Sequence, residues 1–212
     1  MQLTKYSHSC VRFDDGDRTL VIDPGVFSEV NAALDGADAV LITHEHPDHI
    51  DVEQVKAAAR RDDRLRIWAP QPVAAALDSA DQVTVVEPGQ ALDAAGFAVR
   101  TFGGQHALIH PTIPVVPNVG FLINETAYHP GDSLIVPPLP VSLLLAPIHA
   151  PWSKTAEVID FVVAVKAPHV VGIHDVLLTD AGRQLVEAHI ARIGGEHGSR
   201  YIPLAPAAST RI

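Results

Sequence analysis

The chain has 212 residues, of which 47% are hydrophobic, and a formal net charge of −10 at pH 7. This length and composition are sufficient for a real core, and they favour a single domain over residues 1–212. The acidic balance argues against a nucleic-acid partner, because such a partner needs a basic surface.

Three short strands are predicted near the start of the chain, at residues 3–6, 10–13 and 19–22. Residues 14–17 form a hairpin turn between the second and the third. The third strand ends in Asp23-Pro24-Gly25, where an acid is often only a turn cap. His8 lies between the first two strands and, from the residues alone, reads as an ordinary loop histidine.

The next strand leads into an unusual cluster of histidines. The apolar run 39–42 reads as a buried strand, and the segment Thr43-His44-Glu45-His46-Pro47-Asp48-His49 follows it. Strand geometry would place His44 and His46 on one face, and Pro47 forces a turn that can swing Asp48 and His49 beside them. Imidazole and carboxylate are ligands that divalent metals prefer, and four of them here suit two adjacent metals better than one. A run of surface histidines is the weaker alternative, because the cluster follows directly on a buried strand.

Helices and strands then alternate along the chain, which favours an α/β layered domain. A helix is expected at 51–61, with Asp51 as its N-cap and Gln54 as the capping-box partner. The elements predicted after it are a strand at 65–69, a helix at 70–78, and strands at 83–86 and 98–102.

Two histidines follow the strand at 98–102. His106 and His110 have the spacing of a helical metal pair. Gly103 and Gly104 before them, and the prolines in 111–117 after them, favour a loop instead. A stiff loop is therefore expected at 111–117, near any site that these histidines join.

The last third of the chain continues the pattern. A hairpin is predicted at 120–128, followed by His129-Pro130-Gly131-Asp132-Ser133, and His174 stands at the end of a strand at 170–173. The other elements expected are a strand at 141–149, a helix capped by Ser153 or Thr155, a final helix capped by Thr179 and ended by Gly194-Gly195, and a closing strand at 201–204.

The His-x-His-x-Asp-His segment resembles the signature of the metallo-β-lactamase-fold hydrolases. His129-Pro130-Gly131-Asp132-Ser133 is similar to the His-x-Gly-Asp-Thr motif of the same family. The resemblance covers nearly the whole chain, and it implies a four-layer α-β-β-α sandwich with two divalent metal ions, zinc first and manganese or iron as alternatives. The ligands that it implies are His44, His46 and His106 for one metal, Asp48, His49 and His174 for the other, and Asp132 between them.

The resemblance also implies roles for residues around the ligands. Asp23 would support a ligand histidine, and His129 would be structural. His106 is chosen as the third histidine ligand because it stands closest to the preceding strand, and His110 is the fallback. His8-Ser9-Cys10 is similar to a segment of the ascorbate-phosphate lactonase-like group, in which the histidine faces the active site. His149 is expected to line the same site.

No segment of the sequence predicts secretion or a membrane span. The first residues lack a cationic segment followed by an apolar one, so no signal peptide is expected. The most apolar stretch, 134–148, contains four prolines and cannot form a spanning helix. Cys10 is the only cysteine, which excludes an internal disulfide. A cytoplasmic protein with no membrane partner fits these features.

The function expected from this reading is metal-dependent hydrolysis. A hydroxide bridging two metals would attack a small ester, lactone or phosphorylated metabolite. The catalytic residues expected are Asp48, as a metal ligand, and His8 or His110, which would supply a proton. A phosphodiesterase or nuclease and a non-catalytic metal-binding protein are the alternatives. The acidic charge weighs against the nuclease, and the complete ligand set weighs against the non-catalytic protein. Apolar proline-rich loops make a homo-oligomer plausible.

Overall fold

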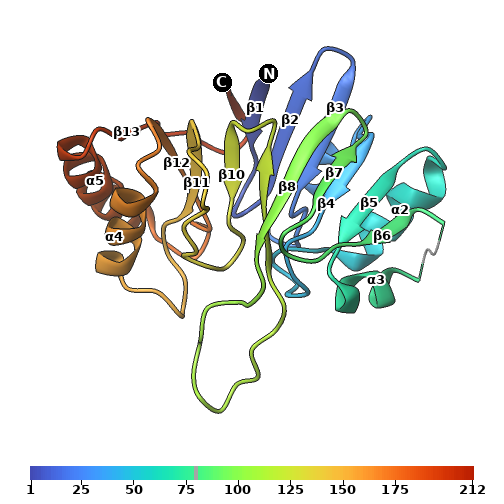
Figure 1. Ribbon diagram of the computed structural model, residues 1–212, viewed down its shortest axis with the longest axis horizontal. Helices are drawn as coiled ribbons and strands as arrows, with labels where there is room; N and C mark the ends of the chain where they lie inside the picture. The colour runs from blue at the N-terminus through green and yellow to red at the C-terminus, as the bar shows by residue number, and fades with distance from the viewer. Residues whose placement is uncertain (79–80) are drawn as a thin grey trace.

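The computed structural model describes residues 1–78 and 81–212. Over these residues it forms two mixed sheets of seven strands each, which pack face to face. Helices cover the outer face of each sheet, α4 and α5 on one side and α2 and α3 on the other (Figure 1). The predicted four-layer α-β-β-α sandwich is thereby confirmed.

The first sheet has the order β14-β1-β2-β3-β4-β5-β6. Its elements are β14 (Ala208–Arg211), β1 (Gln2–Lys5), β2 (Val11–Asp15), β3 (Arg18–Ile22), β4 (Ala39–Leu41), β5 (Arg66–Ala69) and β6 (Val83–Val85), with helices α1 (Val30–Ala33), α2 (Val52–Arg61) and α3 (Gln71–Leu77).

The second sheet has the order β13-β12-β11-β10-β9-β8-β7. Its elements are β13 (Arg200–Tyr201), β12 (His169–Ile173), β11 (Leu143–Pro147), β10 (Ala127–His129), β9 (Val119–Ile123), β8 (Phe97–Gly103) and β7 (Ala91–Ala94), with helices α4 (Thr155–Val165) and α5 (Asp180–Glu196).

The central strands are apolar on both faces because both faces are covered. In β3, Leu20 and Ile22 pack into the core between the two sheets, whereas Val21 packs against the helices of its own side. In β11, Leu145 faces the central core and Leu144 faces the helices. This is why these segments read as continuous apolar runs rather than as alternating strands.

Strands of both sheets deliver their carboxyl ends to one edge of the sandwich. β1 and β2, and β2 and β3, pair antiparallel, so β1 runs with β3, which pairs parallel with β4. In the other sheet β8 runs with β10, β11 and β12 for the same reason. The two edges meet, because the Val119 amide donates to the Thr43 carbonyl and the His174 amide donates to the His8 carbonyl. The long loop between β8 and β9 projects at this edge, at the bottom of Figure 1.

Most predicted elements are present, with several differences at their ends. The side chain of Asp51 accepts from the Gln54 amide as expected, but the Asp51 amide donates to the Pro24 carbonyl rather than to Gln54. The N-cap of α4 is Lys154, not Ser153 or Thr155. The final helix passes through Gly194 and Gly195 and ends at Glu196, since it is Gly198 that takes the left-handed φ of +90°.

Strands β7 and β14 and helix α1 were not predicted. β14 pairs along the whole of β1, so the end of the chain completes the first sheet. None of the described helices combines the length and apolar composition that a membrane crossing requires.

The central core predicts a large difference between two leucines. Leu145→Ala empties a site that is 0% exposed and should lower the free energy of unfolding by about 2–5 kcal/mol. Leu185, on the outer face of α5, is 61% exposed, and Leu185→Ala should change it by less than about 0.5 kcal/mol. Urea unfolding followed by circular dichroism measures both, and equal losses would contradict the assigned core.

Candidate metal centre

The predicted ligands lie in loops at the carboxyl ends of four strands. His44, His46, Asp48 and His49 follow β4, and the other three follow strands of the second sheet. Those three are His106 after β8, Asp132 after β10 and His174 after β12. The structure brings all seven together, because these strand ends share one edge of the sandwich.

Three histidines form the first set. His44, His46 and His106 each offer a nitrogen, and these atoms lie within 4.8 Å of one another. Nε2 of His44 is 3.1 Å from Nδ1 of His46, and the rings of His46 and His106 have centroids 4.8 Å apart. His46 is half-buried, so this set is reached from solvent.

A second set surrounds Asp48. His8, Asp48, His49 and His174 offer ligand atoms within the same 4.8 Å limit. Nε2 of His8 is 3.1 Å from Oδ2 of Asp48, and Nε2 of His174 is 3.5 Å from the same oxygen. His8 therefore joins this set as closely as the predicted ligands do.

Asp132 lies between the two sets. Its Oδ1 is 3.0 Å from Nε2 of His49, and its Oδ2 is 3.2 Å from Nε2 of both His106 and His174. His44, His49 and Asp132 also form a group that could hold a metal. One carboxylate thus faces nitrogens of both sets.

The hydrogen bonds at the ring nitrogens suit metal binding. Nδ1 of His49 donates to Asp23 at 2.6 Å, Nδ1 of His174 donates to the His149 carbonyl at 2.6 Å, and Nδ1 of His106 donates to the Ala107 carbonyl at 2.5 Å. Each bond leaves the lone pair on Nε2, which points into the cluster. A metal-binding histidine is normally held in this way through its other nitrogen.

Several polar atoms at the centre lack hydrogen-bond partners. Among the described residues, Nε2 of His49, Nε2 of His174 and Oδ1 of Asp132 are buried without one, although they lie close to one another. An unpaired buried polar atom costs about 1–3 kcal/mol, so such atoms rarely gather by accident. Ligand atoms gathered in this way without hydrogen bonds fit a divalent cation.

Asp23 and Thr43 support the ligands from beneath. The Asp23 carboxylate is fully buried and accepts from the Thr43 amide at 2.8 Å, from its hydroxyl at 2.7 Å and from His49. The Thr43 hydroxyl oxygen also lies 3.0 Å from Nδ1 of His44. His129 donates to the Ser9 carbonyl at 2.9 Å and accepts from the Gly131 amide, and it belongs to none of the ligand groups among the described residues.

Two contributing residues were not predicted from the sequence. Nε1 of Trp152 donates to Oδ2 of Asp132 at 2.9 Å, and its ring lies beside those of His106 and His174. Buried Asn118 accepts from the Asp132 amide and donates to the Pro130 carbonyl. Their only signal in the sequence was that each adjoins a strand end.

Two other histidines with predicted roles belong to none of the ligand groups among the described residues. His110 is exposed in the long loop, where its Nδ1 lies 2.7 Å from the Thr112 hydroxyl, and it belongs to none of the described ligand groups. His149 is half-buried and contributes its backbone carbonyl to His174. His106, not His110, therefore stands with His44 and His46.

Backbone strain is concentrated at the centre. His8, Asp23 and His174 have φ values of +61°, +52° and +58°, in the left-handed region. Such conformations are uncommon for residues other than glycine and gather at functional sites. They turn each chain sharply after its strand, which directs the three side chains into the cluster.

The charges of the cluster shift the pKa values of its members in opposite directions. Burial opposes ionisation of Asp132, but His49, His106 and His174 outweigh it and hold the pKa of the carboxyl well below its usual range. Burial also acts against the charge of His174, yet Asp132 and Asp48 raise its pKa to about 9. Burial and the neighbouring His49 lower the pKa of His44. These are the electrostatics of anionic and basic ligands held close together.

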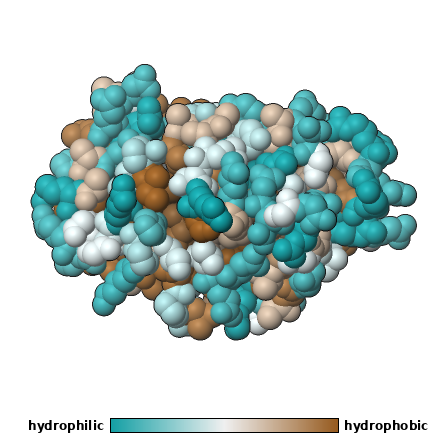
Figure 2. Space-filling view, turned by 90° about the horizontal axis from the view of Figure 1, so that it is seen from above, coloured by the Kyte–Doolittle hydropathy of each residue, from teal (hydrophilic) through white to brown (hydrophobic). Residues whose placement is uncertain are grey.

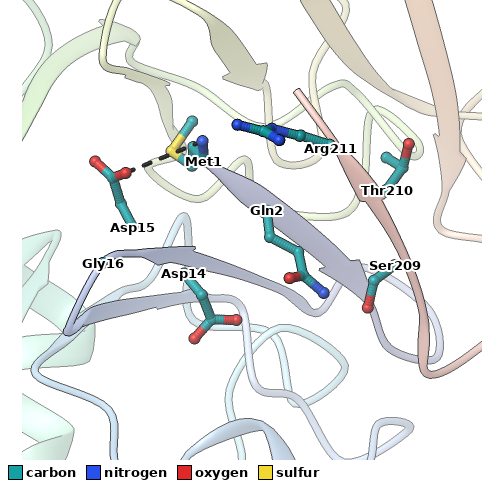
Figure 3. A pocket seen from close by; sticks show the side chains of 8 residues that line it. All are labelled: Met1, Gln2, Asp14, Asp15, Gly16, Ser209, Thr210 and Arg211. Carbon is teal, nitrogen blue, oxygen red and sulfur yellow. Dashed lines mark ion pairs between the residues drawn. The ribbon is translucent and has the colours of Figure 1, made fainter.

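The opposite end of the sandwich lacks such chemistry. A hollow of about 540 Å³ lies there between the two chain termini and the β2–β3 turn, and its lining includes Met1, Asp15 and Arg211 (Figure 3). The amino group of Met1 pairs with Asp15 at 4.0 Å. Figure 2 shows this end, which is mostly hydrophilic with a few hydrophobic residues near its middle. The hollow contains no histidine or cysteine and is no candidate for the metal centre.

Comparison with known proteins agrees with the fold and the cluster. The family model described as the beta-lactamase superfamily domain matches residues 2–174. The chain belongs to this superfamily. It is 38% identical to Protein Rv0786c of Mycobacterium tuberculosis over 188 residues, which are 86% of this chain and 88% of that protein.

Two further relatives carry descriptions of an activity. A UPF0173 metal-dependent hydrolase of Xanthobacter autotrophicus is 28% identical over 169 residues, covering 71% of this chain and 68% of that protein. The solved structure of Igni18, described as a metallo hydrolase from Ignicoccus hospitalis, has a TM-score of 0.75 at 17% identity and covers 99% of this chain and 97% of its own. The superfamily resemblance is confirmed, and the narrower one to the ascorbate-phosphate lactonase-like group stays a prediction.

The position of Asp23 predicts its effect on metal affinity. Asp23→Asn keeps the shape but removes the charge that His49 and Thr43 bind, so the affinity for zinc should fall about 10–100-fold. Competition with a chromophoric chelator measures the affinity, and circular dichroism checks that the variant is folded. Asp51→Asn, at the α2 cap outside the cluster, is the matched control. If Asp23→Asn bound zinc as tightly as the parent protein, the supporting role of Asp23 would be contradicted.

Proposed function

We propose that this metal-dependent hydrolase holds two divalent cations and cleaves a small ester, lactone or phosphorylated metabolite. The observation that carries the proposal is the position of Asp132, whose two oxygens face histidines of both ligand sets. A single four-ligand site would leave three of the seven converging ligands without a role. His44, His46 and His106 would hold one cation, Asp48, His49 and His174 the other, and Asp132 both.

The donor set supports zinc first, with manganese or iron as alternatives, because imidazole and carboxylate suit all three. When bound, such cations supply a hydroxide at neutral pH and polarise the substrate oxygen. The protein's part is to fix the ligands through Asp23 and Thr43 and to keep Asp132 oriented by Trp152 and Asn118. The fixed Nδ1 bonds set which nitrogen of each histidine is offered.

His8 is the best-supported candidate for a proton donor to the leaving group. Its ring centroid is 3.9 Å from that of His174 and its Nε2 approaches Asp48, whereas His110 lies outside the cluster. Burial lowers the pKa of His8, which makes its protonated form a stronger acid and a less populated one near neutral pH. The resemblance of His8-Ser9-Cys10 to the lactonase-like group supports the same assignment.

Metal analysis of the purified protein, paired with an activity panel, tests the proposal. Zinc-loaded protein should hold two cations per chain and hydrolyse at least one class among lactones, carboxylic esters and phosphate esters. Two bound cations without turnover across the panel would favour a non-catalytic role. A cytoplasmic location, which we also propose, agrees with the buried thiol of Cys10 but is tested separately by cell fractionation.

Substitutions at Asp132 and His106 distinguish a ligand that both cations share from a ligand that binds only one cation. Asp132→Ala removes a carboxylate that faces both sets, so both cations should bind at least about tenfold more weakly. His106→Ala removes a ligand from one set and should weaken only one cation. Isothermal titration with zinc resolves the two events, and retention of both cations at full affinity by Asp132→Ala would contradict the bridging role.

The two candidate proton donors predict different kinetics. His8→Asn tolerates the left-handed backbone at this position and should lower kcat by about 100-fold or more for esters with poor leaving groups. For 4-nitrophenyl esters the loss should be much smaller, because a good leaving group needs little protonation. His110→Asn is the matched comparison and should resemble the parent.

Metal content must be measured on the same samples, because His8 also lies with the second ligand set. A loss of one cation in His8→Asn would assign His8 as a ligand instead. Equal rates for both leaving-group classes, with metal content intact, would remove His8 as the acid.

A further inference from the structure

The large exposed hydrophobic residues of this protein are gathered around the metal centre. Among the described residues, all of them except Val85 and Leu185 lie on four loops that follow β3, β8, β10 and β12. They are Val26, Phe27, Leu108, Ile113, Val115, Ile135, Val136, Val176 and Leu177. We call this set the apolar rim.

The rim is continuous with the ligands. The Phe27 ring meets the His8 ring edge-on at 5.5 Å, and the Val26 amide donates to the Pro47 carbonyl within the histidine segment. Leu108 follows His106 by two residues, and Leu177 follows His174 by three. Half-buried Trp152 adds an aromatic surface against the rings of both histidines. Exposed apolar residues gathered on loops beside a candidate metal centre are typical of a binding site rather than of chance exposure.

The same loops lack lysine and arginine. No lysine or arginine occurs in residues 6–10, 23–29, 42–51, 104–118, 130–136, 148–153 or 174–179. The nearest lysines along the chain are buried Lys5, which binds Asp175 at 2.9 Å, and Lys154 at the N-cap of α4, which is exposed and lies 3.6 Å from Glu157. Phosphate and carboxylate groups are normally recognised by arginine or lysine, so a charged group beside the scissile bond would find no such partner here.

We infer that the substrate is an uncharged ester or lactone whose apolar chain lies on the rim while its carbonyl reaches the metal centre. The inference rests on the proposed hydrolytic function and narrows it to one of the three substrate classes. Hydrolysis adds water across the acyl C–O bond and gives a carboxylic acid and an alcohol, or one hydroxy acid from a lactone.

Chain-length series test the inference in the zinc-loaded protein. With 4-nitrophenyl acetate, butyrate, hexanoate and octanoate, kcat/KM should rise about two- to fourfold for each added methylene. Leu108→Ser and Leu177→Ser should flatten this rise. Leu185→Ser is the matched control, since Leu185 is equally exposed, at 61% against 55% and 54%, but lies on α5. It should keep the slope of the parent.

A binding series separates failure of the inference from failure of the proposed function. Acetohydroxamate and octanohydroxamate carry the same metal-binding head with different chains, and the longer one should bind the zinc-loaded protein at least about tenfold more tightly in calorimetry. Stronger binding of the longer chain without turnover of any ester would remove the hydrolytic function and leave recognition of an apolar chain standing. Turnover with equal rates for all chain lengths would overturn the inference alone.

Two other outcomes also overturn it. A preference for 4-nitrophenyl phosphate over every ester would show that a charged group is recognised without lysine or arginine. A change of mass in light scattering by the rim variants, with an unaltered chain-length slope, would assign the rim to contact between copies of the chain.

Discussion

The buried carboxylate of Asp23 is the group whose hydrogen bonds hold the candidate metal centre together. It stands at the end of β3 and takes hydrogen bonds from both the backbone and the side chain of Thr43, at the end of β4. Its bond to Nδ1 of His49 then fixes the last residue of the histidine segment. A carboxylate without solvent contact is stable only with such partners. The hydrogen bonds that position the ligands therefore also offset the desolvation free energy of this carboxylate. Gly25 completes the arrangement, because a Cβ there would overlap the backbone carbonyl of Asp48.

The topology of the two sheets brings residues that are distant in the sequence to this local arrangement. Parallel strands in each sheet, joined by helical crossovers, place their carboxyl ends on one edge, and the face-to-face packing of the sheets brings two such edges together. Candidate ligands separated by more than a hundred residues, such as His49 and His174, can then offer ligand atoms within 4.8 Å of one another. The strained backbones of His8 and His174 serve the same arrangement, because the chain must turn sharply after each strand for these side chains to enter the centre.

Much of this arrangement could be predicted from the sequence. The prediction failed for residues whose positions depend on contacts with distant parts of the chain. The four ligands after β4 were readable because one strand and one proline place them, and the apolar runs of the central strands predicted a covered sheet. His106 and Asp132 were identified through the family resemblance, because a lone Gly-Asp or a loop histidine has no signal of its own. Strand β14 escaped notice since its residues 208–211 alternate between half-buried and exposed, and only pairing with β1 makes them a strand.

Trp152 shows why the remaining contacts could not be read from the chain. An aromatic residue after a buried strand is compatible with core, surface or site, and its role arises only because β10 and β11 are neighbours and bring its indole N–H to Asp132. The same neighbourhood gives the centre a mixed character, with charges inside and apolar side chains at its border. Charged ligands keep their pKa shifts only where water is limited, so an apolar border strengthens the electrostatics of the centre that it surrounds, and it would also suit the apolar substrate that we propose.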